Sequence, residues 1–195
     1  MKKLYLIRHG HSLHNELFLK MGVKAFRIPE VKDSPLTDKG HHQSKSLGET
    51  IGEKHIDLVL VSPLMRTLET AENIFGDKNI PIRCMECLRE YPLGLDTCNI
   101  RSSVKFLMGK FPEIDFTELV SDTDIYWKPG GETFDELDER ISEFVEYVKK
   151  LPHKKIAVIS HNSWIGRLKD NHISQLENGE EELKHCYPYE YILSD

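Results

Sequence analysis

The sequence lacks long apolar runs, an excess of basic residues and a set of paired cysteines. No apolar run among its 195 residues approaches the roughly 20 that a membrane-spanning helix needs, and Met1-Lys2-Lys3 leads into a short strand-like run rather than a signal-peptide core. Its 26 Lys and Arg are outnumbered by 32 Asp and Glu, so a net charge of -6 provides no basic surface for nucleic acid or anionic lipid. We therefore expect a cytoplasmic protein without nucleic-acid or membrane partners.

The four cysteines are too few for a disulfide scaffold in a chain of this length, and we expect free thiols. Cys84 and Cys87 have the C-x-x-C spacing of zinc and redox sites, but Cys98 and Cys186 are isolated and provide no second pair. Half-buried thiols are the favoured interpretation. A zinc-binding redox module at Cys84 and Cys87 is kept as a minor alternative, and the sequence predicts neither a metal nor a cofactor.

Short apolar runs alternate with helical patterns along the chain. The runs expected to form buried strands are 4–7, 56–62, 80–84 and 155–160, and a last strand is expected at 189–193 after an acidic surface loop at 175–184. Helices are expected from Thr37 to about His55, from Pro63 onward, and from Thr133 until Pro152. This alternation predicts one α/β domain over 1–195, a three-layer α/β/α sandwich with a mostly parallel central sheet.

The segment from about 91 to 131 is the least regular part of the chain. It contains three prolines and two adjacent glycines, and only its stretch from Ser102 to Lys110 has a helical pattern. We interpret it as an insertion in the α/β domain. Because insertions of this kind often shape binding sites, we expect it to govern substrate specificity.

Two predicted strands run directly into a histidine, and ligands of parallel sheets bind beyond the carboxyl ends of the strands. Arg8-His9 follows the first strand, His161 follows another, and Arg66 begins the helix after Ser62-Pro63. A guanidinium forms paired hydrogen bonds with phosphate oxygens, and a neutral imidazole nitrogen can attack phosphorus. Each residue alone has an ordinary structural explanation. Together they predict a phosphate-handling site.

Five motifs occur in one order. They are Arg8-His9-Gly10 with Asn15, Leu36-Thr37 with Gly40 and Gln43, Ser62-Pro63-Leu64 with Arg66 and Thr70, Glu90, and Ser160-His161. With these motifs the sequence resembles the histidine phosphatase superfamily, the phosphoglycerate-mutase-like proteins, over nearly its whole length. The segment that begins Arg89-Glu90-Tyr91-Pro92 is similar to the mutase-like proteins of plants and fungi. The resemblance implies a phosphoglycerate-mutase-like fold.

The resemblance also implies roles. His9 would become phosphorylated, Arg8, Arg66 and His161 would enclose the phosphoryl group, and Glu90 would be the general acid. Physically, the second ring nitrogen of His9 should donate to a backbone carbonyl so that the attacking nitrogen stays unprotonated. A protonated His161 would help to offset the phosphoryl charge.

Other matched positions allow two interpretations each. Asn15 would bind phosphate or substrate, or cap a helix. Thr37, Gly40 and Gln43 are expected to build a helix start, and Arg140 to form a structural ion pair. His11 and Asn162 depart from the usual family residues, and we expect Asn162 to tolerate the backbone angles of the glycine it replaces. Candidates for the substrate mouth are His11, Tyr91 and Arg101, and His11 has simple exposure as its alternative. For His14 we favour a solvated surface position, with an approach to the mouth as the alternative.

The predicted function is that of a metal-independent phosphomonoesterase that acts through a phosphohistidine on a small phosphorylated metabolite. Only about 40 residues separate Glu90 from Glu132, which is shorter than the insertion of the phosphoglycerate mutases that the chain resembles, so hydrolysis is favoured over a mutase-type isomerisation. A non-catalytic protein that binds a phosphorylated ligand is the alternative from another class. The sequence leaves homo-oligomer formation open.

Overall fold

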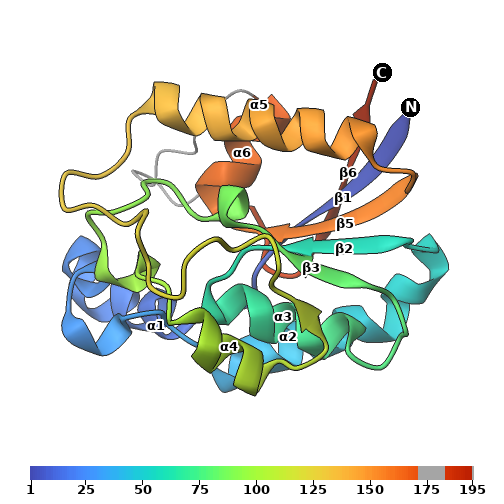
Figure 1. The fold of residues 1–195 in the computed structure, drawn as a ribbon. Helices are drawn as coiled ribbons and strands as arrows, with labels where there is room; N and C mark the ends of the chain where they lie inside the picture. The colour runs from blue at the N-terminus through green and yellow to red at the C-terminus, as the bar shows by residue number, and fades with distance from the viewer. Residues whose placement is uncertain (171–182, 195) are drawn as a thin grey trace.

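Six strands form a single sheet in the order β4-β3-β2-β5-β1-β6 in the computed structural model, which describes residues 1–170 and 183–194 (Figure 1). The strands are β1 (Lys2–Arg8), β2 (Leu58–Val61), β3 (Ile82–Cys84), β4 (Ile114–Asp115), β5 (Lys155–Ser160) and β6 (Pro188–Leu193). Strands β1 to β5 pair in parallel, and β6 is antiparallel to β1. The predicted mostly parallel sheet is confirmed, but the short β4 was not foreseen.

Helices cover both faces of this sheet (Figure 1). They are α1 (Leu13–Met21), α2 (Asp38–Thr50), α3 (Met65–Phe75), α4 (Val104–Lys110), α5 (Phe134–Lys150) and α6 (Asn162–Asp170). Short 3-10 turns are η1 (Gly22–Phe26), η2 (Pro29–Val31), η3 (Ile51–Lys54), η4 (Glu86–Leu88) and η5 (Thr97–Asn99). Because α5 and α6 lie on one face and α2, α3 and α4 on the other, the predicted three-layer α/β/α sandwich is confirmed.

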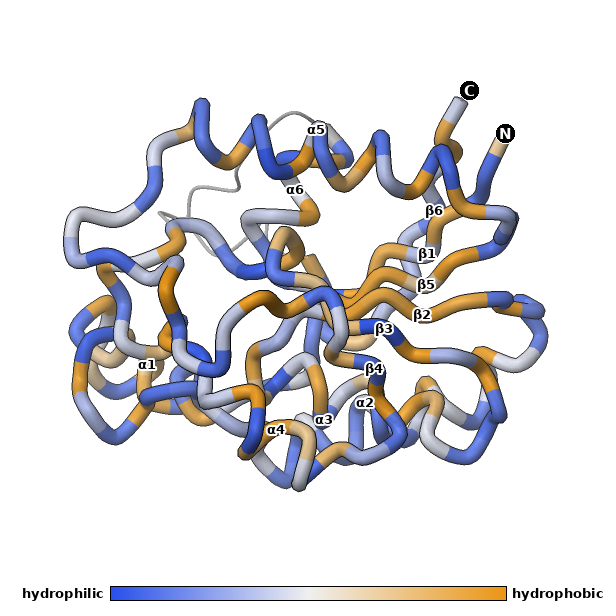
Figure 2. The backbone as a smooth tube through the Cα atoms, viewed as in Figure 1, coloured by the Kyte–Doolittle hydropathy of each residue, from blue (hydrophilic) through white to orange (hydrophobic). Residues whose placement is uncertain are grey.

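Alternate residues of the central strands supply the two halves of the core. In β1, Leu4 and Leu6 pack with α5 and α6, whereas Tyr5 and Ile7 pack with α2 and α3. The strands are apolar on both faces, as expected for strands buried between two helical layers, and Figure 2 shows them as the apolar centre of the molecule. The near-continuous apolar runs of the sequence therefore correspond to strands buried on both sides.

Side-chain caps set the starts of two helices that cover the sheet. Thr37 accepts a hydrogen bond from the Gly40 amide at the start of α2, and Thr133 and Glu136 form a reciprocal capping box at the start of α5. Both starts are where the sequence places them. The helix α4 occupies the stretch from Ser102 to Lys110 that was predicted inside the irregular segment.

The register of the sheet brings the candidate site together. Arg8 at the end of β1 lies beside Ser160 at the end of β5, and the His9 amide donates to the Ser160 carbonyl at 3.1 Å. Strand β2 flanks β5 on its other side, so Ser62 and α3 begin at the same edge. The carboxyl ends of three neighbouring strands thus deliver His9, His161 and Arg66 to one place.

Residues 171–182 and 195 lie outside the described part of the chain, and most of the acidic loop predicted at 175–184 falls among them. The strand predicted to follow that loop is confirmed as β6. Among the described residues, none of the helices combines the length and the apolar character that crossing a membrane requires.

Candidate active site

A cavity of about 270 Å³ lies where β1 and β5 end. We call its buried lining residues the floor: Arg8, His9, His14, Arg66, Cys98, Asn99 and Asn162. We call its half-buried lining residues the rim: Asn15, Phe26, Glu90, Tyr91, Pro92, Asp96 and Ser163. Four of the five residues predicted to act on phosphate line this cavity, and His161 lies directly behind it.

His9 is held in one tautomer at the floor. Its Nδ1 lies 2.7 Å from the Gly10 carbonyl oxygen, which can only accept a hydrogen bond, so Nδ1 carries the proton. Its Nε2 is then unprotonated and accepts a hydrogen bond from Arg66 Nε at 3.3 Å. Burial, together with the charge of Arg66, lowers the pKa of His9 well below its usual value. The predicted contact with a backbone carbonyl is confirmed, and the imidazole is neutral with a lone pair available at Nε2.

Arg66 contributes a buried guanidinium next to this lone pair. It lies in the first turn of α3 and is only 1% exposed. Its Nη1 donates to the Cys98 carbonyl and its Nη2 to Asn99 Oδ1, both at 2.9 Å. None of the described carboxylates forms an ion pair with it, and burial lowers the pKa of Arg66. A buried cation with only neutral acceptors favours an incoming anion.

The segment that precedes β6 holds the other side of the floor. Arg8 donates from Nη1 to the Leu183 carbonyl at 2.7 Å, and the Leu183 amide donates to Asn162 Oδ1 at 3.0 Å. His185 donates from Nδ1 to the His9 carbonyl at 2.5 Å, because a carbonyl oxygen can only accept. Backbone and side-chain contacts from this distant segment therefore fix the position of both Arg8 and His9.

His161 packs against His9 without lining the cavity. The two ring centroids are 5.2 Å apart, and His161 Nε2 lies 2.8 Å from Ser62 Oγ. Its Nδ1 is buried with no hydrogen-bond partner among the described residues. Burial and the nearby Arg66 lower the pKa of His161 well below its usual value. Both effects favour a neutral His161 in the empty site, and its protonation and direct contact beside a bound phosphoryl group stay predictions.

Glu90 lies on the rim at the start of α6. Its Oε1 accepts hydrogen bonds from the amides of Tyr91 at 2.8 Å and Trp164 at 3.3 Å, and its Oε2 from the Ser163 amide at 3.4 Å. Burial raises the pKa of Glu90, and this effect exceeds the lowering by the backbone amides and Arg66. A carboxyl group that retains its proton more readily, next to a cavity, can act as a proton donor.

Asn15 and His14 line the cavity from the start of α1. Asn15 Oδ1 accepts from the amide and the hydroxyl of Ser12 at 3.1 and 2.7 Å, so the predicted capping alternative is confirmed, while the residue also faces the cavity. Because the Ser12 hydroxyl donates to Asn15, it accepts from His14 Nδ1 at 2.9 Å. Burial lowers the pKa of His14 well below normal. The favoured prediction of a solvated His14 is therefore wrong, since the residue is buried in the cavity lining.

The loop after His9 is fixed against the start of α2. The His11 amide donates to Gln43 Oε1 at 2.8 Å, and His11 Nδ1 lies 2.9 Å from Thr37 Oγ1. A Cβ atom on Gly40 would lie 2.0 Å from the His11 carbonyl oxygen, so only glycine allows this close approach. Thr37 and Gly40 form the predicted helix start, and Gln43, on the same helix, also holds the loop. His11 is half-buried, lies against Thr37 and is not among the residues that line this cavity, so its place at the substrate mouth stays a prediction.

Of the other mouth candidates, Tyr91 lies on the rim and Arg101 does not. Arg101 is 2% exposed, forms an ion pair with Glu86 at 2.8 Å, and donates to backbone carbonyls of residues 102 and 121–123. Its placement at the mouth is wrong, because these carbonyls and Glu86 bind the whole guanidinium inside the insertion. Arg140 forms the predicted structural ion pair, with Glu132 at 2.5 Å.

Asn162 does not adopt the glycine-like backbone that was expected of it. It is the first residue of α6 and is not among the residues with positive φ. Its side chain instead accepts the hydrogen bond from the Leu183 amide. The expectation of a strained turn is wrong, and the replacement of glycine has a different use, the attachment of the segment before β6.

Several cavity residues were missed by sequence reasoning. They are His14, Phe26, Asp96, Cys98, Asn99 and Ser163. Asp96, Cys98 and Asn99 lie in the irregular segment, which was predicted to shape specificity without individual assignments. Phe26 comes from η1, where no periodic pattern exists to mark it. Of these residues, His14 could have been assigned to the site from the sequence, since it adjoins Asn15 in the first motif.

The cysteines and histidines do not form a metal group in the described residues, where no three His, Cys, Asp or Glu side chains are placed to hold an ion. Cys84 is buried, and burial raises the pKa of its thiol well above normal. The pKa of Cys87 is likewise raised to about 12. These are properties of inert thiols, in contrast with the lowered pKa of reactive or metal-binding cysteines.

Comparison with known proteins agrees with this geometry. Residues 4–174 match the model of the histidine phosphatase superfamily (branch 1). The chain is 29% identical to Phosphoglycerate mutase-like protein 1 of Arabidopsis thaliana, over 84% of this chain and 69% of that protein. It is 30% identical to Phosphoserine phosphatase 1 of Hydrogenobacter thermophilus, over 83% and 71%. The solved structure of the alpha-ribazole phosphatase from Shigella flexneri matches with a TM-score of 0.59 at 24% identity, covering 85% of this chain and 77% of that one.

Proposed function

This chain belongs to the histidine phosphatase superfamily, and from that premise we propose that it is a phosphomonoesterase in which His9 carries the phosphoryl group. One observation supports this above all: His9 is neutral, its Nδ1 proton is bound by the Gly10 carbonyl, and its Nε2 lone pair lies beside Arg66 in the cavity floor. A nucleophile and an anion-binding group therefore share one end of the cavity.

In the first half of the reaction, His9 Nε2 attacks the phosphorus of the ester. The bond from phosphorus to the ester oxygen breaks as the nitrogen to phosphorus bond forms, and Glu90 gives its proton to the leaving oxygen. Arg66 and Arg8 balance the charge on the phosphoryl oxygens, since buried guanidinium groups stabilise that charge without reorganising. His161, buried against the His9 ring, fixes the direction of attack.

In the second half, water attacks the phosphorus of phosphorylated His9. Glu90, now ionised, accepts a proton from the water as the bond from phosphorus to Nε2 breaks. This returns His9 to its neutral form and Glu90 to its protonated form, and inorganic phosphate leaves. No step needs a metal ion, because the two arginines supply the positive charge that a metal would otherwise provide.

Hydrolysis is proposed ahead of isomerisation, although the superfamily includes relatives named as mutase-like as well as phosphatases. A mutase must hold a second anionic group of its substrate while the first is transferred. The rim offers Glu90 and Asp96 but no Lys or Arg among the described residues, so a doubly anionic intermediate has no partner there. An assay for interconversion of 3-phosphoglycerate and 2-phosphoglycerate, with bisphosphoglycerate present, tests this choice directly.

The experiment that tests the proposal is turnover of p-nitrophenyl phosphate with a chelator present, comparing the wild type with His9→Ala. We expect turnover by the variant to be lower by a factor on the order of 10⁴ or more, as when other covalent nucleophiles are removed. Acid-quenched wild type should carry phosphate on a histidine. Equal turnover by both proteins would contradict the assignment of His9 as the nucleophile. Loss of wild-type activity on chelation would contradict the metal-free chemistry. Phosphate binding without turnover would support the non-catalytic alternative.

A further inference from the structure

We infer that the natural substrate is a phosphomonoester whose alcohol part is uncharged or cationic and carries a flat apolar group, and that the rim selects against esters with a second anionic group. The inference rests on the proposed phosphatase function and identifies the substrate class for that site. It comes from the distribution of charge and aromatic rings between the floor and the rim.

The floor has enough positive charge for one phosphoryl group and no more. Arg8 and Arg66 are its two cations, and both lie next to His9. The buried histidines add no charge, because burial lowers the pKa of His9, His14 and His161 well below normal. Two guanidinium groups match the charge of a phosphate dianion, so no cation of the floor is left for a further anion.

In the described part of the chain, the rim, where the alcohol part must lie, has no unpaired cation. Glu90 and Asp96 are its acidic residues, of which Glu90 holds its proton while the ester is intact, and among the described residues the rim contains no Lys or Arg. Arg27 lies just outside, where its Nε is 3.2 Å from Asp96 Oδ1, so its charge is already paired. A carboxylate or second phosphate on the alcohol part would therefore lie near the Asp96 carboxylate without a cation to bind it, whereas an amine could bind Asp96.

The rest of the rim offers flat apolar surfaces that are already held in place. Phe26 stacks on Phe18 with ring centroids 5.2 Å apart and an interplanar angle of 7°. Tyr91 stacks on Phe134 at 5.1 Å, and Pro92 follows it. Side chains that are fixed by a second ring lose little freedom when a ligand packs on them. An aromatic or heterocyclic alcohol part suits these surfaces better than a short polar chain does.

The charge selection is tested with three esters of one skeleton: phenyl phosphate, 4-carboxyphenyl phosphate and 4-(aminomethyl)phenyl phosphate. We expect kcat/KM for the carboxylate to be about 10-fold below that for phenyl phosphate, since a like charge several ångströms away in a partly buried site has an effect of this order. The amine should be hydrolysed at least as well as phenyl phosphate. Equal or faster hydrolysis of the carboxylate overturns the inference.

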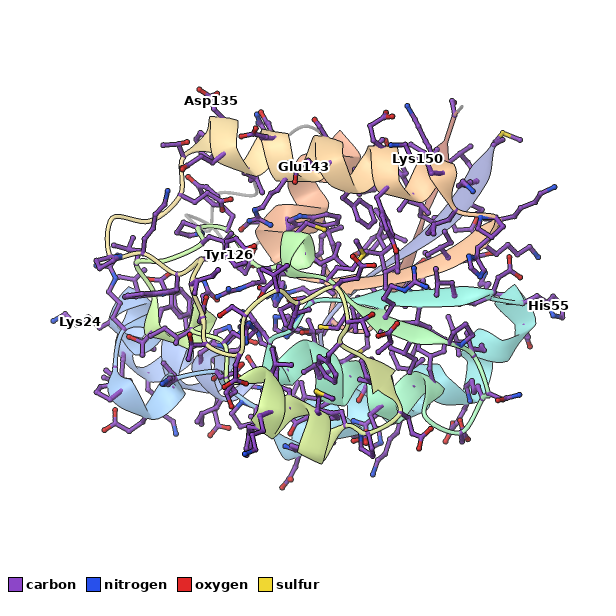
Figure 3. All side chains as sticks on the ribbon, viewed as in Figure 1. Lys24, His55, Tyr126, Asp135, Glu143 and Lys150 are labelled. Carbon is purple, nitrogen blue, oxygen red and sulfur yellow. The ribbon has the colours of Figure 1, made fainter. Side chains whose placement is uncertain are left out.

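The variant Asp96→Asn separates the charge effect from differences in leaving-group chemistry, because the same two esters are compared in the variant and in the wild type. The variant keeps the side-chain size and leaves the charge of Arg27 unpaired, so kcat/KM for the carboxylate relative to phenyl phosphate should rise about 10-fold over the wild-type ratio. Asp135→Asn is the matched control. Asp135 is exposed at the start of α5 and points away from the molecule in Figure 3, so its ratio should equal that of the wild type. A ratio unmoved by Asp96→Asn contradicts the role given to Asp96.

Phe26→Ala tests the aromatic part of the inference. It should lower kcat/KM for 2-naphthyl phosphate about 10-fold more than kcat/KM for glycerol 1-phosphate, the order expected from the loss of one stacked ring. Equal losses for both esters overturn this part. Failure of the phosphatase proposal looks different: then no ester is hydrolysed in a way that depends on His9. Hydrolysis that depends on His9 but shows no charge preference contradicts the substrate class alone.

Discussion

In the floor of the cavity Arg66 has only neutral hydrogen-bond acceptors, whereas the two arginines that hold the insertion, Arg89 just before it and Arg101 within it, lie against carboxylates. Arg89 binds Asp124 at 2.6 Å and Arg101 pairs with Glu86 at 2.8 Å, and all three guanidinium groups are at most 2% exposed. Burying a charge costs free energy, which a buried partner offsets. For Arg89 and Arg101, carboxylates within the fold offset the free energy of burying the charge. For Arg66, no carboxylate among the described residues forms such an ion pair.

The difference separates structural from functional charge. A paired buried cation holds loops together, and removing it leaves a carboxylate alone. An unpaired one destabilises the empty fold and gains its partner when an anion binds, which is how strongly perturbed groups come to mark active sites. The following variants test this division between Arg66 and the insertion arginines, and extend it to the other groups of the floor and rim.

Among these variants, Arg66→Lys should produce the largest effect on activity. Lysine keeps the charge but cannot reproduce the three directed contacts to His9, Cys98 and Asn99, so kcat/KM for phenyl phosphate should fall by about 10² to 10³. Steady-state kinetics measure this. The urea unfolding midpoint should stay close to that of the wild type, and a collapse of stability would show that Arg66 is a structural residue like its counterparts in the insertion.

Arg101→Met should show the reverse pattern. The substitution keeps much of the side chain's length but removes one of the two arginine partners of Glu86, the other being Arg89, and the donors to four backbone carbonyls. We expect the free energy of unfolding to fall by about 3 kcal/mol, as when one member of a buried pair is removed. Urea titration measures it. At urea concentrations below those that unfold the protein, kcat/KM should stay within about twofold of wild type. A loss as large as that of Arg66→Lys would contradict the division between structural and functional arginines.

Glu90→Gln should lower kcat for alkyl esters by about 10² and affect p-nitrophenyl phosphate much less, because a good leaving group needs no proton. Stability should change in the opposite direction. The folded pKa of Glu90 is raised above 4.5, so its stabilising contribution is present below pH 4.5 and is lost as pH rises through the folded pKa. The glutamine variant should therefore be the more stable protein at pH 7, with no difference at pH 4. Lower stability at pH 7 would contradict the raised pKa.

The buried histidines should make the protein sensitive to mild acid. Because the folded pKa of His161 is lowered well below 6.5, its contribution is complete above pH 6.5 and is lost as pH falls below that value. Each such histidine adds a limiting slope of about 1.4 kcal/mol per pH unit. For His161→Asn, the free energy of unfolding should therefore fall less steeply between pH 7.5 and 5.5 than it does for the wild type, and the two slopes should differ by up to this amount. His55→Asn is the control, since His55 is exposed at the edge of the molecule (Figure 3), and a change of slope in it would contradict the assignment.

Asn162→Gly should have the smallest effect. It removes the acceptor for the Leu183 amide, whose carbonyl binds Arg8, so about 1 kcal/mol of stability should be lost with one hydrogen bond. KM should rise a few-fold with kcat nearly constant, because Arg8 is held less firmly. Hydrogen exchange at the Leu183 amide reports the contact directly. Unchanged exchange there would show that Asn162 does not attach this segment.

Much of the fold could be predicted because it follows from local rules. The apolar run at 155–160 is a strand with those bounds, and the capping signal at Thr133 gives the start of α5. Strand β4 could not be predicted, because it has only two residues and owes its existence to pairing with β3. A strand that short has no period to detect.

The site divides in the same way. Arg8, His9 and Arg66 could be predicted because their chemistry and their place at strand and helix ends agree. Arg101 could not be told from them, since a buried arginine looks alike in sequence whether it faces phosphate or Glu86. The protonation of His161 depends on Arg66 nearby and on complete burial, and both are properties of the three-dimensional packing.

The position of β1 within the sheet has a consequence for how the chain is made. The strand that leads to His9 is synthesised before the other strands of the sheet, yet its two neighbours, β5 and β6, come from residues 155–160 and 188–193. At 5 to 20 residues per second, roughly 7 to 36 seconds separate β1 from these neighbours during translation. Both edges of an apolar strand wait unpaired for that time, in the state most prone to aggregation. The active site is therefore among the last features of the nascent protein to form.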